Sequence, residues 1–114
     1  MFRDWGYAPE YVKAIWLMLQ QEEPEDFIIC SGEAHSLEEF VKEAFEKLDL
    51  DFEIFLKIDK SLYRPVDLEI IYGDNSKAKN ILGWQYNMTF EDLISVLVKD
   101  EVEYFNWNLS NHGV

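Results

Sequence analysis

The spacing of apolar residues predicts four helices along the chain. In a surface helix, apolar side chains recur every three or four residues and form one buried stripe. The segments with this spacing are residues 9–22, 37–48, 75–82 and about 90–105. In the first segment, the face expected to be buried consists of Val12, Ile15, Trp16 and Leu19. The tail from Asn106 onward is expected to be frayed.

Residues that start and stop helices support these boundaries. Ser36 is a favoured N-cap, and Glu39 three residues later completes a capping box before the second helix. Thr89 and Asp92 have the same spacing at the start of the last helix. The boundary residues expected for the third helix are Asp74 or Asn75 as its cap and Gly83 as its stop.

Three shorter segments have the composition or the alternation of β-strands. Residues 26–31 form an apolar run that Gly32 closes, and residues 52–58 place apolar side chains at every second position. Residues 68–72 form a third short run. The order α-β-α-β-β-α-α predicts an α/β fold, a small mixed layer structure of about four helices with two or three short strands. No linker-like stretch interrupts residues 1–114, so one domain is expected.

Charge narrows the range of partners. The chain has 10 Lys and Arg against 23 Asp and Glu, a formal net charge of −13. Such a surface repels nucleic-acid phosphates and anionic lipid, so neither nucleic acid nor a membrane is an expected partner. A phosphate-bearing ligand would have to be held by a few local cations. The single cysteine, Cys30, allows no internal disulfide and fits a reducing cytoplasm. No apolar stretch approaches the ~20 residues of a membrane span.

The motifs of self-sufficient catalysis are missing from the sequence. The five glycines stand at positions 6, 32, 73, 83 and 113, too far apart for a Gly-rich phosphate cradle. No Tyr is followed four residues later by Lys, and no Gly-x-Ser-x-Gly nucleophile elbow occurs. His35, just before the cap Ser36, is expected to make a local hydrogen bond, and one Cys with two His weakly supports a zinc site. No catalytic, cofactor-binding or metal-binding residue is therefore expected in this chain.

Six short motifs, in order, give the chain a resemblance to a known enzyme family. They are Arg-Asp-Trp-Gly-Tyr-Ala at 3–8, Trp-Leu-Met-Leu-Gln-Gln at 16–21, Gly-Glu-Ala-His-Ser at 32–36, Tyr-Arg-Pro at 63–65, Gly-Asp at 73–74 and Leu-Gly-Trp at 82–84. Together they resemble the GDP-mannose 4,6-dehydratases, which are extended short-chain dehydrogenase/reductases. The Leu-Met-Leu-Gln-Gln and Gly-Glu-Ala-His-Ser runs are the parts most specific to that family.

The resemblance implies that residues 1–114 are the single C-terminal substrate-binding domain of such an enzyme. The family converts GDP-mannose to GDP-4-keto-6-deoxy-mannose with tightly bound NADP, which removes a hydride from the sugar and returns it after loss of water. In the family, the dinucleotide motif and the catalytic residues lie upstream of the Arg-Asp-Trp motif. The chain is therefore expected to lack the dinucleotide-binding N-terminal half, to be inactive alone and to belong to a homo-oligomer.

The same resemblance implies three residues for the GDP-sugar. Arg3 and Arg64 match arginines that bind the nucleotide diphosphate, and the planar guanidinium fork suits phosphate oxygens. Asp67 stands where the family usually has a Glu that contacts the ribose region of the nucleotide. The side chain of Asp67 is shorter than that Glu by one methylene group.

Two other interpretations are open from the sequence. The chain fits a piece of another nucleotide-sugar epimerase or reductase, because the Arg-Asp-Trp, Arg-Pro and Leu-Gly-Trp motifs occur across those enzymes. The Leu-Met-Leu-Gln-Gln run argues against that interpretation. The second alternative is a stand-alone, non-enzymatic acidic interaction domain, which the absence of catalytic motifs favours for this chain taken by itself.

Overall fold

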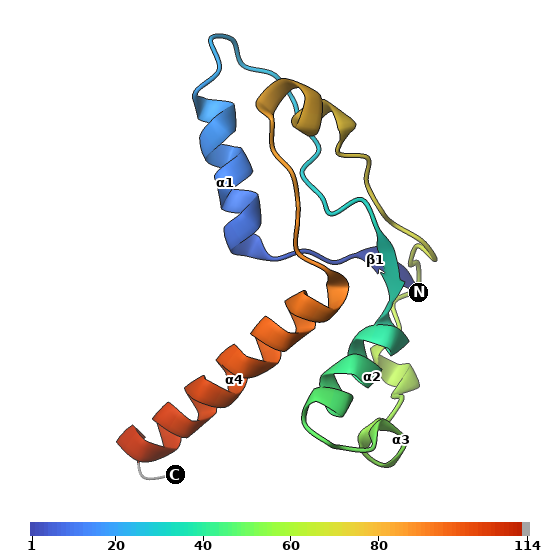
Figure 1. Cartoon of the computed structure of the whole chain (residues 1–114). Coiled ribbons are helices and arrows are strands. Elements are labelled where there is room, and N and C mark those ends of the chain that lie inside the picture. The colour runs from blue at the N-terminus through green and yellow to red at the C-terminus, as the bar shows by residue number, and fades with distance from the viewer. Residues whose placement is uncertain (113–114) are drawn as a thin grey trace.

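The computed structural model describes residues 1–112 and has the mixed α/β architecture predicted from the sequence (Figure 1). Two short strands pair in the middle of the molecule. The elements are β1 (Phe2–Asp4), α1 (Ala8–Leu19), β2 (Ala34–Ser36), α2 (Leu37–Lys47), α3 (Phe52–Phe55), the 3-10 turn η1 (Lys60–Leu62), the π-helical η2 (Ala78–Leu82) and α4 (Phe90–His112).

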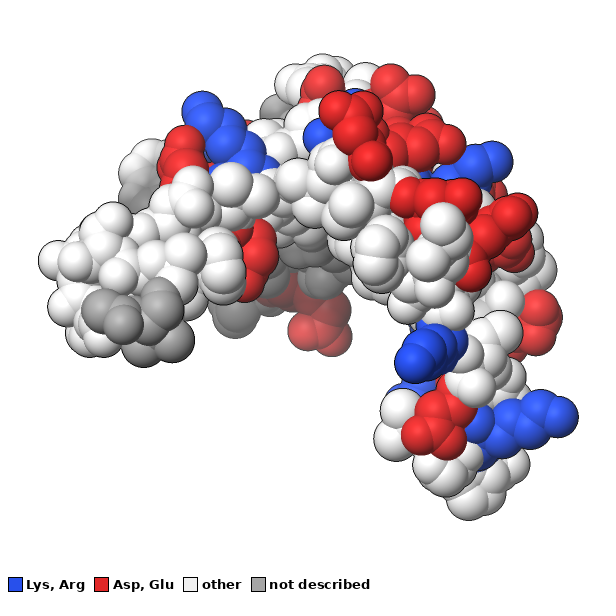
Figure 2. All heavy atoms as spheres, turned by 90° about the horizontal axis from the view of Figure 1, so that it is seen from below, with Lys and Arg blue, Asp and Glu red and all other residues white. Residues whose placement is uncertain are grey.

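The molecule is open rather than round. Its radius of gyration is 17.7 Å and its extents are 51 × 39 × 24 Å, whereas a compact domain of this length has a radius of gyration of about 13 Å. Figure 1 shows α1 and η2 together on one side of the β1–β2 pair, and α2, α3 and α4 on the other. The space-filling view shows an arched outline over which acidic side chains gather (Figure 2).

The two strands that form are not those expected from the sequence. β1 pairs with β2 in antiparallel register, with Arg3 opposite His35. The predicted strand 68–72 is reduced to a single parallel bridge between Phe2 and Ile70. That bridge consists of a 2.7 Å bond from the Phe2 N–H to the Glu69 carbonyl and a 3.0 Å bond from the Ile71 N–H to the Phe2 carbonyl.

The other two predicted strands are wrong, for separate physical reasons. Residues 26–31 have no strand beside them among residues 1–112, and side chains take part of their backbone hydrogen bonding: Asn75 donates to the Cys30 carbonyl at 3.0 Å. Within 52–58 the short helix α3 forms instead, because the Asp51 carboxylate accepts from the Glu53 N–H at 3.0 Å and caps a helical turn.

The helix boundaries follow the predicted caps. The Ser36 hydroxyl accepts from the Glu39 N–H at 3.0 Å, and the Thr89 hydroxyl accepts from the Asp92 N–H at 3.1 Å. Gly83 ends η2 with φ +70°, a left-handed conformation that glycine adopts without strain. Neither Asp74 nor Asn75 caps η2 itself, whose N-cap is Lys77 without a side-chain bond, but the Asp74 carboxylate accepts from the Ser76 N–H at 2.9 Å in the turn just before it.

The predicted stripe on α1 faces outward, which corrects the expectation for that helix. Its four residues are 51–77% exposed, and the buried residue of the helix is Ala14. Ala14 forms the core cluster with Ala78, Leu82 and Trp84. The half-buried residues packed against this cluster are Tyr11, Leu17, Met18, Phe27, Ile29 and Tyr86. Both faces of α1 are apolar, so periodicity alone did not identify which one this chain buries.

The last helix is longer than predicted, and the expectation of a frayed tail from residue 106 is wrong for residues 106–112. Polar side chains in this stretch bond back to the preceding turn: the Ser110 hydroxyl donates to the Asn106 carbonyl at 3.0 Å and the Asn111 amide to the Trp107 carbonyl at 2.8 Å. At its other end α4 buries Leu93 and Ile94. Residues 113–114 lie outside the described part of the chain.

Candidate functional site

The structure brings the three predicted site residues together. Arg3 lies on β1, while Arg64 and Asp67 lie in the loop after η1. An Arg3 guanidinium nitrogen donates to one Asp67 carboxylate oxygen at 2.8 Å, and an Arg64 nitrogen donates to the other at 2.9 Å. One carboxylate thus bridges two arginines that are far apart in the sequence.

Backbone contacts explain why this loop lies beside β1. The bridge between Phe2 and residues 69–71 anchors the chain two residues beyond Asp67. Pro65 fixes its own φ and sterically disfavours helical backbone at Arg64. The Leu68 N–H donates to Asp67 at 2.9 Å and orients the carboxylate. A second Arg3 nitrogen donates to the Phe2 carbonyl at 2.7 Å, which holds the guanidinium close to β1.

The cluster lies on an open surface. The side chains of Arg3, Arg64 and Asp67 are 20%, 68% and 34% exposed. The hydrogen bond from Arg64, together with the charges of both arginines, lowers the pKa of Asp67, so the carboxylate is ionised at neutral pH. Two fixed cations and one anion can hold a phosphate group, but this part of the chain provides no wall to enclose one.

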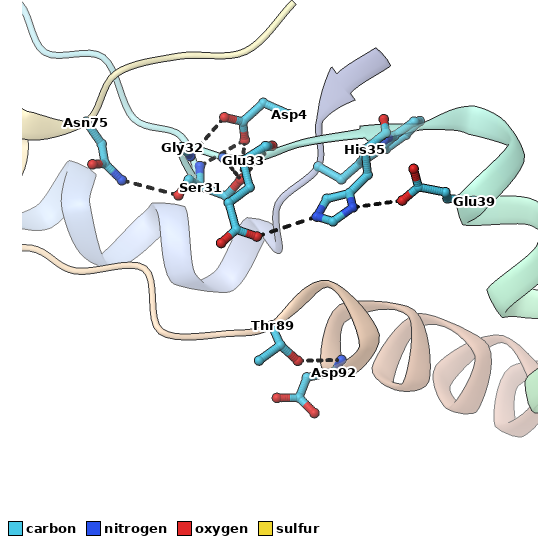
Figure 3. Close-up of polar contacts among 10 residues, drawn as sticks. Asp4, Ser31, Gly32, Glu33, His35, Glu39, Asn75, Thr89 and Asp92 are labelled. Atoms are coloured by element: carbon cyan, nitrogen blue, oxygen red, sulfur yellow. Dashed lines mark hydrogen bonds and ion pairs between the residues drawn. The ribbon is translucent and has the colours of Figure 1, made fainter. Parts of the chain in front are cut away.

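Asp4 is a structural residue of the site that sequence reasoning missed. Its carboxylate accepts from the Ser31 N–H at 2.9 Å, the Ser31 hydroxyl at 2.6 Å and the Gly32 N–H at 2.9 Å (Figure 3). It also accepts from the Gly73 N–H at 3.3 Å. It thereby joins three separate segments next to Arg3. Its place beside Arg3 in the Arg-Asp-Trp motif is the signal that could have identified it.

His35 has the local bonding expected from the sequence. One ring nitrogen lies 3.0 Å from Glu39 and the other 3.4 Å from Glu33 (Figure 3). The ring stacks on Phe90 at a centroid distance of 3.9 Å and an angle of 7°, which links β2 to the start of α4. The hydrogen bond from His35 lowers the pKa of Glu39. These contacts give His35 a structural role at the α2–α4 junction.

A cavity of about 670 Å³ lies at that junction and does not include the arginine cluster. Its lining residues are His35, Glu39, Lys42, Glu43, Glu46, Thr89, Phe90 and Glu91. Four of these are glutamates, so the cavity opposes an anionic ligand such as a nucleotide.

Two other reactive groups near Asp4 are held in their neutral forms. Burial and the Asp4 carboxylate raise the pKa of Tyr11 to about 12. The same two causes raise the pKa of the Cys30 thiol. Neither group is therefore suited to act as a base or a nucleophile at neutral pH.

The residues present do not fit a dinucleotide cofactor. A dinucleotide cradle needs a Gly-rich turn leading into a helix N-terminus. The residues before α1, α2 and α4 are Tyr7, Ser36 and Thr89, and Gly83 follows η2 instead of preceding a helix. Within residues 1–112, no group of three or more potential metal ligands comes together, and no helix is long and apolar enough to cross a membrane.

Comparison with known proteins finds relatives in the same family that the sequence motifs resemble. The family model for GDP-mannose 4,6 dehydratase matches residues 1–97. GDP-mannose 4,6 dehydratase from Dictyostelium discoideum is 40% identical, over 90% of this chain and 33% of that protein. GDP-mannose 4,6 dehydratase 2 from Arabidopsis thaliana is 43% identical, over 89% of this chain and 27% of that protein.

A solved structure supports the fold independently. RMD from Pseudomonas aeruginosa complexed with NADPH superimposes with a TM-score of 0.73 at 17% sequence identity, covering 88% of this chain and 32% of that one. The chain therefore spans about a third of the length of the relatives and of the solved structure that it matches.

Proposed function

The chain belongs to the GDP-mannose 4,6-dehydratase family, and from this premise we propose that it forms the GDP-sugar-binding part of such an enzyme. In this proposal Arg3 and Arg64 bind the diphosphate of GDP-mannose. The observation that carries it is the convergence of both guanidiniums on one point, 2.8 Å and 2.9 Å from the two oxygens of Asp67. A carboxylate presents oxygens to arginine much as a phosphate does.

The role of these residues is to hold and orient the substrate. Arg3 is fixed by its bond to the Phe2 carbonyl and by the strand it lies on, so little side-chain entropy is lost when a phosphate binds. Arg64 is more exposed and extends from a loop that Pro65 stiffens. Two charges of the same sign at fixed positions suit a diphosphate better than a single phosphate. A contact between Asp67 and the ribose remains a prediction.

We place the redox chemistry of the reaction in the other two thirds of the protein. Residues 1–112 offer no dinucleotide cradle, so in this proposal the NADP that would accept and return the hydride binds outside them. The supporting observation is the amount of uncovered apolar surface. Val12, Ile15, Trp16 and Leu19 of α1 are exposed, and every residue from 53 to 72 is exposed. Surfaces of this kind mark interaction sites, and we assign them to the dinucleotide-binding part.

The same proposal covers assembly and location. We expect the complete enzyme to be a homo-oligomer that acts in the cytoplasm. An uncharged stretch at the end of α4, with Tyr104, Phe105 and Trp107 exposed, is available for contacts between subunits. The single Cys30 is a free, buried thiol, which is compatible with a reducing compartment.

The proposal is tested best in a chimera in which this chain replaces the matching third of the Dictyostelium enzyme. Arg64→Ala should weaken GDP binding roughly ten- to a hundredfold, because a hydrogen bond to a charged group contributes about 1.5–3 kcal/mol. NADP binding should be nearly unchanged, since Arg64 does not belong to a dinucleotide cradle in this proposal. Calorimetric titration of GDP and NADP measures both affinities.

Two control variants sharpen this test. Arg64→Lys should recover only part of the lost affinity, because a point charge cannot reproduce the bidentate fork. Lys60→Ala removes a cation from the same exposed segment and should leave the GDP affinity within about twofold, the range of a remote surface charge. Equal GDP affinities in the wild-type and Arg64→Ala chimeras would reduce Arg64 to a surface ion-pair residue.

A further inference from the structure

The Asp4 carboxylate joins the strand of Arg3 to two other segments of the chain. One carboxylate oxygen accepts from the N–H and the hydroxyl of Ser31, at 2.9 Å and 2.6 Å (Figure 3). The other oxygen accepts from the Gly32 N–H at 2.9 Å and from the Gly73 N–H at 3.3 Å. Asp4 follows Arg3 directly in the sequence, so these bonds fix the backbone of β1 next to that arginine.

The bond to Gly73 continues the contact between β1 and the segment that carries Arg64. The Phe2 backbone forms a parallel bridge with residues 69–71 of that segment. Two residues further along both strands, the next bond of such a ladder would join the Gly73 N–H to the Asp4 carbonyl. Here the Gly73 N–H donates to the Asp4 carboxylate instead. The side chain of Asp4 thus extends this pairing beyond the Phe2 bridge.

Close packing fixes the position of Gly73. A Cβ atom at Gly73 would lie 2.6 Å from the sulfur of Cys30 and 3.1 Å from its Cβ, which is closer than van der Waals contact allows. Cys30 is buried, and its carbonyl accepts from the Asn75 side-chain amide at 3.0 Å. The backbone at Gly73 is therefore held against the segment of Cys30, and the Asp4 carboxylate lies where the two segments meet.

We propose that Asp4 is a positioning residue for the GDP-sugar: by binding Gly73, its carboxylate sets the distance between the guanidiniums of Arg3 and Arg64. This inference rests on the proposed function, in which both arginines hold the diphosphate. The two phosphates of a diphosphate are joined by one bridging oxygen, so two guanidiniums bind both of them well only over a narrow range of spacings. Asp4 touches no part of the ligand and acts through the backbone of the segment that carries Arg64 and Asp67.

The first variant is Asp4→Ala in the Dictyostelium chimera, because it removes all of these bonds. We expect GDP to bind roughly three- to tenfold more weakly, since a displaced Arg64 keeps part of a contact whose complete loss costs about tenfold or more. Asp4→Asn should recover part of this loss, because its one amide oxygen can still accept from the two glycine N–H groups. Calorimetric titration of GDP measures these affinities, and unchanged NADP affinity shows that each variant is folded.

A double-mutant cycle separates positioning from a general loss of structure. In the Arg64→Ala background, Asp4→Ala should weaken GDP binding by roughly twofold or less, because the guanidinium that Asp4 positions is already absent. The remainder is the part that a displaced ribose contact of Asp67 would account for. A variant that merely destabilised the chain would weaken GDP binding by the same factor in both backgrounds.

Two further variants test the bond to Gly73 itself. Ser31→Ala is the matched control, because it removes the hydroxyl bond to Asp4 and keeps the bond from Gly73. It should leave the GDP affinity within about twofold, the limit expected for a site that is not coupled to the ligand. Gly73→Ala moves the segment and leaves Asp4 intact, so it should weaken GDP binding as Asp4→Ala does. If the Asp4→Ala chimera does not fold, Gly73→Ala and Asp4→Asn decide the question.

The outcomes distinguish this inference from the proposed function. If Arg64→Ala weakens GDP binding while Asp4→Ala and Gly73→Ala bind GDP as the wild type does, the positioning role of Asp4 is wrong and the site stands. Equal losses from Asp4→Ala with and without Arg64 would also overturn that role. If Arg64→Ala leaves GDP binding unchanged, the site itself is wrong, and this inference fails with it.

Discussion

The core cluster around Trp84 and the segment 53–72 are both rich in apolar residues, but the cluster is buried and the segment is exposed to solvent. Trp84 is 4% exposed, and it packs with Ala14, Ala78 and Leu82 while its indole N–H donates to the Glu10 carbonyl at 3.0 Å. In the segment 53–72 every residue is exposed. The large apolar residues exposed there are Ile54, Phe55, Leu56, Ile58, Leu62, Tyr63, Val66, Leu68, Ile70, Ile71 and Tyr72.

The difference shows which surfaces this chain completes by itself. Around Trp84, the helices α1 and η2 supply both sides of the contact. The segment 53–72 touches the rest of the chain mainly through the Phe2 backbone, the Arg3–Asp67 pair and a stack of Phe55 on Phe45. Its other side has no cover among residues 1–112. Since apolar surface of this extent marks interaction sites, this segment is a candidate for the contact proposed above with a dinucleotide-binding part.

Replacing Trp84 should have the largest effect on stability, because Trp84 lies in the buried core. Trp84→Ala should lower the free energy of unfolding of the 114-residue chain by about 3–5 kcal/mol, because it leaves a cavity and removes a buried hydrogen bond. Trp16→Ala is the matched control, since Trp16 lies on the exposed face of α1 at 60% exposure. It should change the stability by no more than about 0.5 kcal/mol. Urea unfolding followed by circular dichroism measures both, and equal losses would contradict the assigned core.

The second prediction concerns whether the Dictyostelium part of the chimera covers the face of α1 that is exposed in this chain. In the Dictyostelium chimera, Trp16→Ala should cost about 1.5–3 kcal/mol, the value for burying a large apolar side chain. The same substitution should be nearly neutral in the 114-residue chain. Thermal unfolding of the two proteins gives the comparison. A neutral result in both would mean that the remainder of the enzyme does not pack on this face.

Local signals in the sequence predicted the parts of the fold that depend on local structure. The caps at Ser36 and Thr89 and the stop at Gly83 are confirmed, because each acts within one turn of its helix. Strands are different, since a strand exists only beside a partner. The apolar run 26–31 has the composition of a strand and no neighbour to pair with among residues 1–112. The buried face of α1 also depends on its neighbours, and here the prediction was wrong.

The candidate site shows the same division. Resemblance to a family selected Arg3 and Arg64 as candidates through two short motifs, and their role in ligand binding stays a prediction. It gave no sign that Asp67 would bridge them, since that contact depends on where the backbone of residues 69–71 meets Phe2. The four hydrogen bonds that Asp4 accepts were equally hidden. Such contacts join residues roughly thirty to seventy positions apart, and no local pattern encodes them.

The smallest effect concerns how the segment 53–72 is attached. The hydrogen bond from Arg64 lowers the pKa of Asp67 in the folded chain below the ordinary value of an Asp carboxyl. A lowered folded pKa means that this contact stabilises the attachment above the ordinary value and is lost as the pH falls through the folded pKa. We therefore expect the amide of Leu68, which donates to Asp67, to titrate by nuclear magnetic resonance with a midpoint below the ordinary pKa of an Asp carboxyl. In the Arg64→Ala chain, which lacks the largest cause of the shift, the midpoint should move up toward that value.

On acidification the amide of Ile71 should lose protection from hydrogen exchange before that of Gly83, because burial around Trp84 does not depend on the charge of Asp67. Simultaneous loss of both amides would show that the segment 53–72 and the Trp84 core unfold as one unit, and the contrast between the two regions would then not extend to their stability.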